Sequence, residues 1–236
     1  MAQTKEQLAK EWEEFLTNLI KIKETDPALA LYTLKHEKRF TMTEVSPIVR
    51  ETEQAFLIET LSDNTDYPTA LTAEQLINEI KTDLVDYYFM IMYMKLKNKD
   101  ITKHAADFQW FFEQKEGMHQ EILTLIWNLL HEKTIDYEYK FKDIRLNPSK
   151  LSNINSNKEF FKIKETLNSM YEKNPSEGKV AIQVFAKFAN MYWLDIIQEN
   201  KLMSADMIIN VTNVLLGNKD KTSLNAEETT LYNFFI

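Results

Sequence analysis

The chain is poor in glycine and proline and has no cysteine: its 236 residues include only three glycines and five prolines. The tight turns of β-sandwiches and barrels depend on such residues, so their scarcity disfavours those folds and suits long helices. Gly117, Gly178 and Gly217 stand far apart, which excludes glycine-rich loops for dinucleotides and phosphates. The absence of cysteine excludes disulfide frameworks, thiolate zinc sites and cysteine nucleophiles.

Long apolar runs are also missing. The first residues contain no apolar stretch ahead of a cleavage site, so we predict no signal peptide. The most apolar run, from Leu84 to Leu96, contains Asp86 and Lys95 and is shorter than the roughly 20 residues that a membrane helix needs. We therefore expect a cytoplasmic protein with no membrane association.

Acidic residues outnumber basic ones and give a net charge of −8. This balance excludes general nucleic-acid binding, which needs a positive surface. The charge is uneven: residues 1–137 carry −9, residues 138–187 carry +4 and residues 188–236 carry −3. The basic middle is interpreted either as a surface that docks on the acidic N-terminal part or faces solvent, or as a site for an anionic ligand or acidic partner.

Apolar residues at three- and four-residue steps, with capping residues before them, predict an all-α helical bundle of about eight helices. The clearest start is at Thr72 and Gln75, which have the spacing of a capping box, with Leu71 and Leu76 placed as a hydrophobic staple. The helix that follows is predicted to run to about residue 97. Because residues 87–94 are apolar on every side, we expect this helix to be surrounded by others.

One segment departs from the helical period. Ile135, Tyr137, Tyr139 and Phe141 alternate with charged residues, which is typical of a strand. No second segment shows this pattern, so the segment is interpreted either as an extended crossover, which we predict, or as an edge strand that pairs with another molecule. The expected organisation is an N-terminal helical bundle at 1–133, an extended crossover or linker at 134–156, and a smaller C-terminal helical lobe at 157–236.

A long helical pattern runs from residue 100 to about 133, and Gly117 inside it is a position where the helix can kink or break. The pattern contains one spacing of chemical interest. Glu116 and His119 are three residues apart, which places a carboxylate and an imidazole on the same face of a helix. Projected along one continuous helix, His119 falls inside an apolar stripe with Phe112 and Ile122. These four residues, 116–119, resemble the Glu-x-x-His motif of ferritin-like di-iron proteins. No second Glu-x-x-His occurs in the chain, and the alternative interpretation is a half-buried histidine satisfied by a hydrogen bond.

Carboxylates on the preceding helix are candidates to complete such a site. Glu79, Asp83 and Asp86 recur at four- and three-residue steps, and Asp83 and Asp86 are the ones proposed to join Glu116 and His119 as metal ligands. The alternative interpretation of this row is the solvated side of an amphipathic helix.

Two hypotheses for function follow from these observations. The favoured one is a non-catalytic cytoplasmic helical protein that acts by binding a protein partner or by self-association, because no complete catalytic set is present. The alternative is an oxidase or hydrolase that depends on iron, manganese or zinc held by Glu116, His119, Asp83 and Asp86 in the N-terminal bundle.

The metal hypothesis is tested by the metal content of protein purified without chelators or a histidine tag. We expect no stoichiometric metal, because Glu116 and His119 are only two ligands and four or more are needed for a first coordination shell. Stoichiometric iron, manganese or zinc that is lost on His119→Ala substitution would instead establish the enzyme hypothesis.

Overall fold

The computed structural model describes residues 5–40, 46–62, 68–82, 84, 86–114, 118–200 and 204–236. The chain divides into two compact units, unit 1 from Met1 to His104 and unit 2 from Ala105 to Ile236. The division therefore falls earlier than the linker predicted at 134–156, and that segment lies inside unit 2. The predicted fold class is confirmed, since the described residues form helices apart from one two-stranded sheet.

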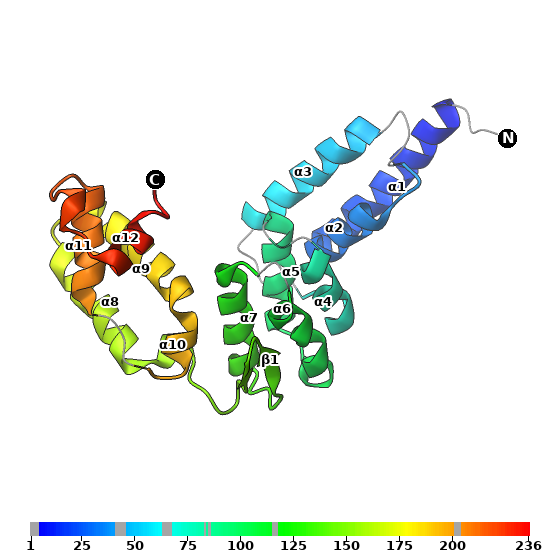
Figure 1. Ribbon diagram of the computed structural model, residues 1–236. Coiled ribbons are helices and arrows are strands. Elements are labelled where there is room, and N and C mark those ends of the chain that lie inside the picture. Colours follow the sequence, from blue (N-terminus) through cyan, green and yellow to red (C-terminus); the bar gives the residue numbers. More distant parts are fainter. Residues whose placement is uncertain are drawn as a thin grey trace. The chain divides into compact units, whose positions relative to one another are not determined.

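The described residues of unit 1 form five α-helices. They are α1 (Lys5–Thr25), α2 (Pro27–His36), α3 (Ser46–Ser62), α4 (Ala73–Thr82) and α5 (Tyr87–Lys97). In Figure 1, α2 lies beside α1 and α3, and it packs against both, whereas α4 packs against α5. The predicted capping box before α4 is formed, because the Thr72 hydroxyl accepts from the Gln75 amide and the Gln75 side chain accepts from the Thr72 amide.

The helix predicted from Thr72 to about residue 97 is two helices, α4 and α5. Asp86 has an extended backbone, and its carboxylate accepts a hydrogen bond from the Phe89 amide at 2.9 Å. An aspartate in this conformation starts a helix instead of continuing one. The prediction that the second half is enclosed on all sides is also wrong, since Tyr87 and Met94 of α5 are 66% and 55% exposed.

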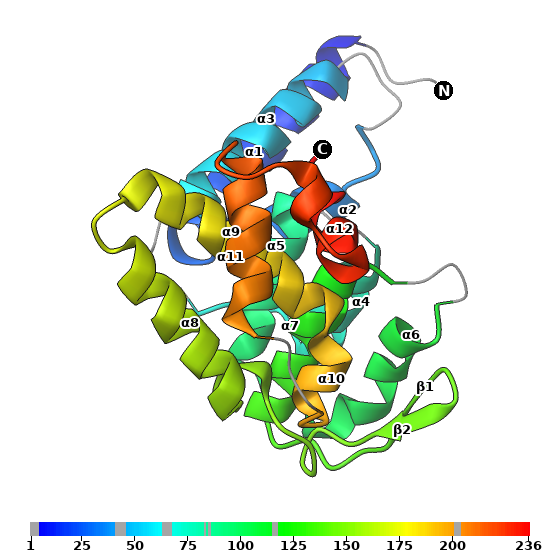
Figure 2. The same cartoon turned by 60° about the vertical axis from the view of Figure 1, so that its left-hand side comes forward.

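Unit 2 begins within the 3₁₀ helix Thr102–Phe108 and is also mainly helical. Its α-helices are α6 (Gln109–Phe112), α7 (Gln120–Glu132), α8 (Lys158–Tyr171), α9 (Pro175–Met191), α10 (Trp193–Ile197), α11 (Ala205–Leu215) and α12 (Ala226–Tyr232). In Figure 2, α8, α9 and α11 run side by side, and each of the three packs against the other two. The long helix predicted from 100 to about 133 is broken, because α6 ends at Phe112 and α7 begins only at Gln120.

The strand-like segment has a partner within the chain, contrary to prediction. β1 (Tyr139–Phe141) pairs antiparallel with β2 (Ile144–Leu146), and Lys142 turns the chain between them with a positive φ of 52°. Such turns usually carry asparagine or glycine, and because neither residue occurs between β1 and β2, a hairpin could not be predicted here. Tyr139 is fully buried, and its hydroxyl donates to the Ala105 carbonyl at 2.8 Å.

The rest of the predicted linker is held in place by polar contacts. The indole of Trp127 donates to the Ser152 carbonyl at 3.1 Å, and the Ser152 amide donates to the Ile197 carbonyl at 3.1 Å. Asn157 caps α8 through the Phe160 amide and donates from its own amide group to the Ile196 carbonyl. This segment is therefore part of the packed structure of unit 2.

The described part of the chain contains more than the predicted eight or so helices, in part because α4–α5 and α6–α7 each replace one long predicted helix. Local sequence signals predicted where helices begin but not where tertiary contacts interrupt them. Within the described residues, none of the helices combines the length and the apolar character that crossing a membrane requires.

One buried carboxylate in unit 1 makes long-range contacts that a simple helix cap does not. Asp26 caps α2 through the Leu29 amide, and its other oxygen accepts from the Thr69 hydroxyl and the Ala70 amide. We expect Asp26→Ala to lower the free energy of unfolding by about 2–4 kcal/mol, since it removes a cap and two hydrogen bonds to a charged group. Asp86→Ala removes only a cap, and we expect a loss of about 1 kcal/mol. Urea denaturation followed by circular dichroism measures both, and equal losses would contradict the assignment.

Candidate functional site

Two of the four predicted metal ligands, Asp83 and Glu116, lie outside the described residues. The other two have separate local roles: Asp86 caps α5 in unit 1, and His119 is the N-cap residue of α7 in unit 2. The side chain of His119 is exposed, so its predicted place in an apolar stripe is wrong. The projection assumed one helical register from Phe108 onward, but the chain leaves the helix after Phe112.

Among the described residues, no three histidine, aspartate or glutamate side chains lie close enough together to hold a metal ion. The metal hypothesis, which rests on Glu116 and His119 with carboxylates from Asp83 or Asp86, therefore stays a prediction.

A different polar cluster lies in unit 1, where α2, α4 and α5 meet. We call it the Glu79 cluster, and it consists of His36, Glu79 and Tyr88. Glu79 is only 5% exposed. One of its oxygens lies 2.8 Å from Nε2 of His36, and the other accepts from the Tyr88 hydroxyl at 2.8 Å. The buried carboxylate is thus bonded at both oxygens, which is what makes its burial tolerable.

The surroundings of the Glu79 cluster perturb two further ionisable groups. Burial raises the pKa of Tyr88, and the hydrogen bond to Glu79 raises it further. The ammonium of Lys35 lies 3.6 Å from the centre of the Tyr88 ring, and burial lowers the pKa of Lys35 although Glu79 favours its charged form.

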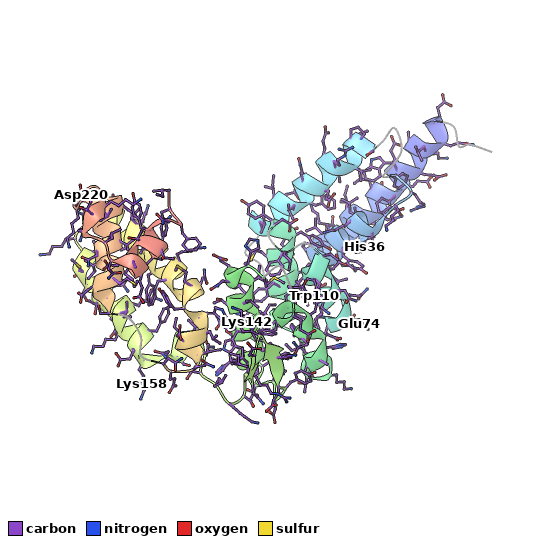
Figure 3. All side chains as sticks on the ribbon, viewed as in Figure 1. His36, Glu74, Trp110, Lys142, Lys158 and Asp220 are labelled. Carbon is purple, nitrogen blue, oxygen red and sulfur yellow. The ribbon has the colours of Figure 1, made fainter. Side chains whose placement is uncertain are left out.

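His36, labelled in Figure 3, is the last residue of α2, and its side chain is 46% exposed. A histidine oriented by a buried carboxylate is a common general-base arrangement, but catalysis also needs a nucleophile or substrate in contact with the histidine. The contacts of Glu79 with His36 and Tyr88 already account for the burial of this carboxylate. We therefore interpret the cluster as a structural tie between three helices.

Sequence reasoning placed Glu79 in a row with Asp83 and Asp86 and did not single it out. Its partners His36 and Tyr88 are 43 and nine residues away in the sequence, and no local pattern connects them. Only the packing of α2 against α5, and of α4 against α5, brings the three side chains together.

Unit 2 contains a different kind of surface feature, a groove between α8 and α9, the pair of helices that begins at Lys158 (Figure 3). It consists of two hollows of about 490 and 480 Å³, and Ile182 lines both. We call it the α8–α9 groove. The first hollow is lined by Leu167, Asn168, Tyr171, Pro175, Gly178, Lys179, Ala181, Ile182 and Gln183. The second is lined by Thr124, Asn128, Ile154, Phe160, Phe161, Lys164, Ile182, Phe185, Ala186, Ala189 and Asn190.

The groove residues recur with the period of a helix on both sides. On α8 they follow the steps Phe161, Lys164 and Asn168, and on α9 they include Ile182 and Ala186. Such spacing places them along one face of each helix. The two hollows therefore follow the same faces of α8 and α9 and meet at Ile182.

The floor of the groove is apolar, and its rim includes exposed apolar side chains. Phe160 and Phe185 stack with ring centres 4.4 Å apart, and both are buried. Phe161 and Ile182 stand above them and are 53% and 41% exposed. Large apolar side chains exposed together beside a hollow are typical of interaction sites.

A buried polar atom lies at one end of the groove. Asn128 of α7 lines the second hollow, and its side-chain oxygen is buried with no hydrogen-bond partner among the described residues. This oxygen is enclosed by its neighbours, so it contributes no exposed polar atom to the wall of the hollow.

In comparison with known proteins, the chain matches no family model, no curated protein and no solved structure. Its function is therefore argued from the chemistry of these surfaces.

Tyr88→Phe tests the role of the Glu79 cluster. The change leaves one oxygen of a buried carboxylate without its donor, so we expect the free energy of unfolding to fall by about 1–3 kcal/mol. Tyr87→Phe, one residue earlier on an exposed side chain, is the matched control, and we expect a change within about 0.5 kcal/mol. Urea denaturation gives both values, and a neutral Tyr88→Phe variant would show that the hydroxyl does not support the fold.

Proposed function

We propose that this chain acts by binding another protein, and that the α8–α9 groove is its contact surface. The observation that carries the proposal is the pair of exposed apolar side chains, Phe161 and Ile182, on opposite helices of a groove with an apolar floor. Burial of such side chains against a partner removes apolar surface from water, which is the main driving force of protein association.

The shape of the groove supports a helical ligand. Two neighbouring helices present a trough along their seam, and an amphipathic helix lies in such a trough with its apolar side chains at three- and four-residue steps. α11 packs against both α8 and α9 but none of its residues lines the groove, whereas α7 contributes Thr124 and Asn128 to the second hollow.

The chemistry of the groove favours protein over nucleic acid. A nucleic-acid surface needs many cations that follow the phosphates, together with aromatic faces for unpaired bases. The groove offers only two lysines among its described lining residues, Lys164 and Lys179, and its stacked aromatic pair, Phe160 and Phe185, is buried. The net charge of −8 supports the same choice, and the absence of cysteine is in keeping with a cytoplasmic location.

Site-specific photo-crosslinking in cells of the source organism tests this function. With benzoylphenylalanine at position 161, we expect one discrete protein adduct. The same probe at position 87, also an exposed aromatic position, is expected to give no such adduct. The protein identified in the adduct is then purified, and its affinity for the chain is expected to fall at least tenfold with Ile182→Asp, about 1.4 kcal/mol of binding free energy.

As a control, circular dichroism and thermal melting are used to check that the Ile182→Asp variant is folded. The proposal fails if position 161 gives no adduct, if positions 161 and 87 give the same adduct, or if the purified protein binds the variant as well as the parent chain.

A further inference from the structure

The charge of the α8–α9 groove differs from that of the chain. The protein carries −8 in total, yet the described residues that line the groove include two lysines and no aspartate or glutamate. Lys179 lines the first hollow, and Lys164 lines the second. Each hollow thus combines an apolar wall with one cation.

The two lysines stand on different helices, on either side of the apolar seam. A helix lying along that seam would place its apolar stripe on Ile182 and on the Phe160–Phe185 stack. The residues on the flanks of its stripe would then face Lys164 on one side and Lys179 on the other. Charged side chains across an interface favour the opposite sign, and a like charge there is strongly disfavoured.

Resting on the proposed function, we infer that the α8–α9 groove binds an amphipathic helix of a partner protein, with glutamates or aspartates on both flanks of its apolar stripe. The acidic flanks pair with Lys164 and Lys179, and the apolar stripe covers Phe161 and Ile182. The cations select the sign of the ligand, and the apolar floor supplies most of the affinity.

The test uses two synthetic helical peptides with the same leucine stripe, at positions i, i+3, i+4 and i+7. One carries glutamates on its flanks and the other carries lysines. Fluorescence anisotropy with the full chain is expected to show at least tenfold tighter binding of the acidic peptide. Ile182→Asp is expected to abolish the binding of both, since it places a charge on the apolar seam.

A charge reversal makes the test specific for the groove. In a Lys164→Glu/Lys179→Glu variant, we expect the preference to change sign, so that the basic peptide binds more tightly. The control is Lys219→Glu/Lys221→Glu, which changes the net charge by the same amount at two exposed lysines of unit 2 that do not line the groove. We expect this control to keep the acidic preference, and a control that reversed it would assign the effect to overall charge and overturn the inference.

Equal or tighter binding of the basic peptide by the parent chain, or no binding of either peptide, overturns the inference. The proposed function is judged separately, by the adduct at position 161. Analytical ultracentrifugation addresses the remaining occupant: a dimer of the parent chain that Ile182→Asp converts to monomer would assign the groove to a second copy, and this too overturns the inference.

Discussion

The close approach of α8 and α9 is the constraint on which the groove and the organisation of unit 2 depend. A Cβ atom added to Gly178 would lie 3.3 Å from Cβ of Tyr171, so a larger residue there would force Tyr171 to shift slightly. Near the other end, the stacked rings of Phe160 and Phe185 fix the distance between the same helices. Because α8 and α9 are in close contact near both ends, the side chains between these two contacts line a defined trough. A rigid trough lowers the cost of binding, because little ordering remains to be done when a ligand enters.

Polar groups at helix ends then hold the surrounding segments to the helices. Asn157 caps α8 and also bonds the Ile196 carbonyl of α10, so one side chain ties the start of α8 to a helix far along the chain. Asp26 does the same in unit 1 for α2 and the segment at Thr69 and Ala70. In both cases a buried polar side chain satisfies backbone groups from two segments, so burial and hydrogen bonding support each other.

The sequence predicted what is local. The cap at Thr72 and the all-α class follow from short-range spacing, and the structure confirms them. The break at Asp86 was missed because aspartate is tolerated in a helix as well as at its start, and the choice is made by packing. The β1–β2 hairpin was missed because Lys142 adopts a positive φ without being glycine or asparagine. The candidate sites could not be predicted from the sequence. The contacts of Glu79 and the groove at Ile182 are made by separate segments, and no local sequence pattern connects those segments.

An acidic protein that binds an acidic helix must attract it locally while repelling it at a distance. At physiological salt the screening length is about 8 Å, so the carboxylates spread over the chain act weakly on a ligand that is still approaching. Within the groove, Lys164 and Lys179 meet the ligand at contact distance and beside apolar walls, where water is displaced and the attraction is less screened. The net charge therefore opposes approach at low salt, whereas the two lysines act once the apolar stripe is seated. In the proposed complex, this separation allows the groove to select acidic helices although the chain as a whole is acidic. The charge of the groove, and not the net charge of the protein, then decides which partner binds.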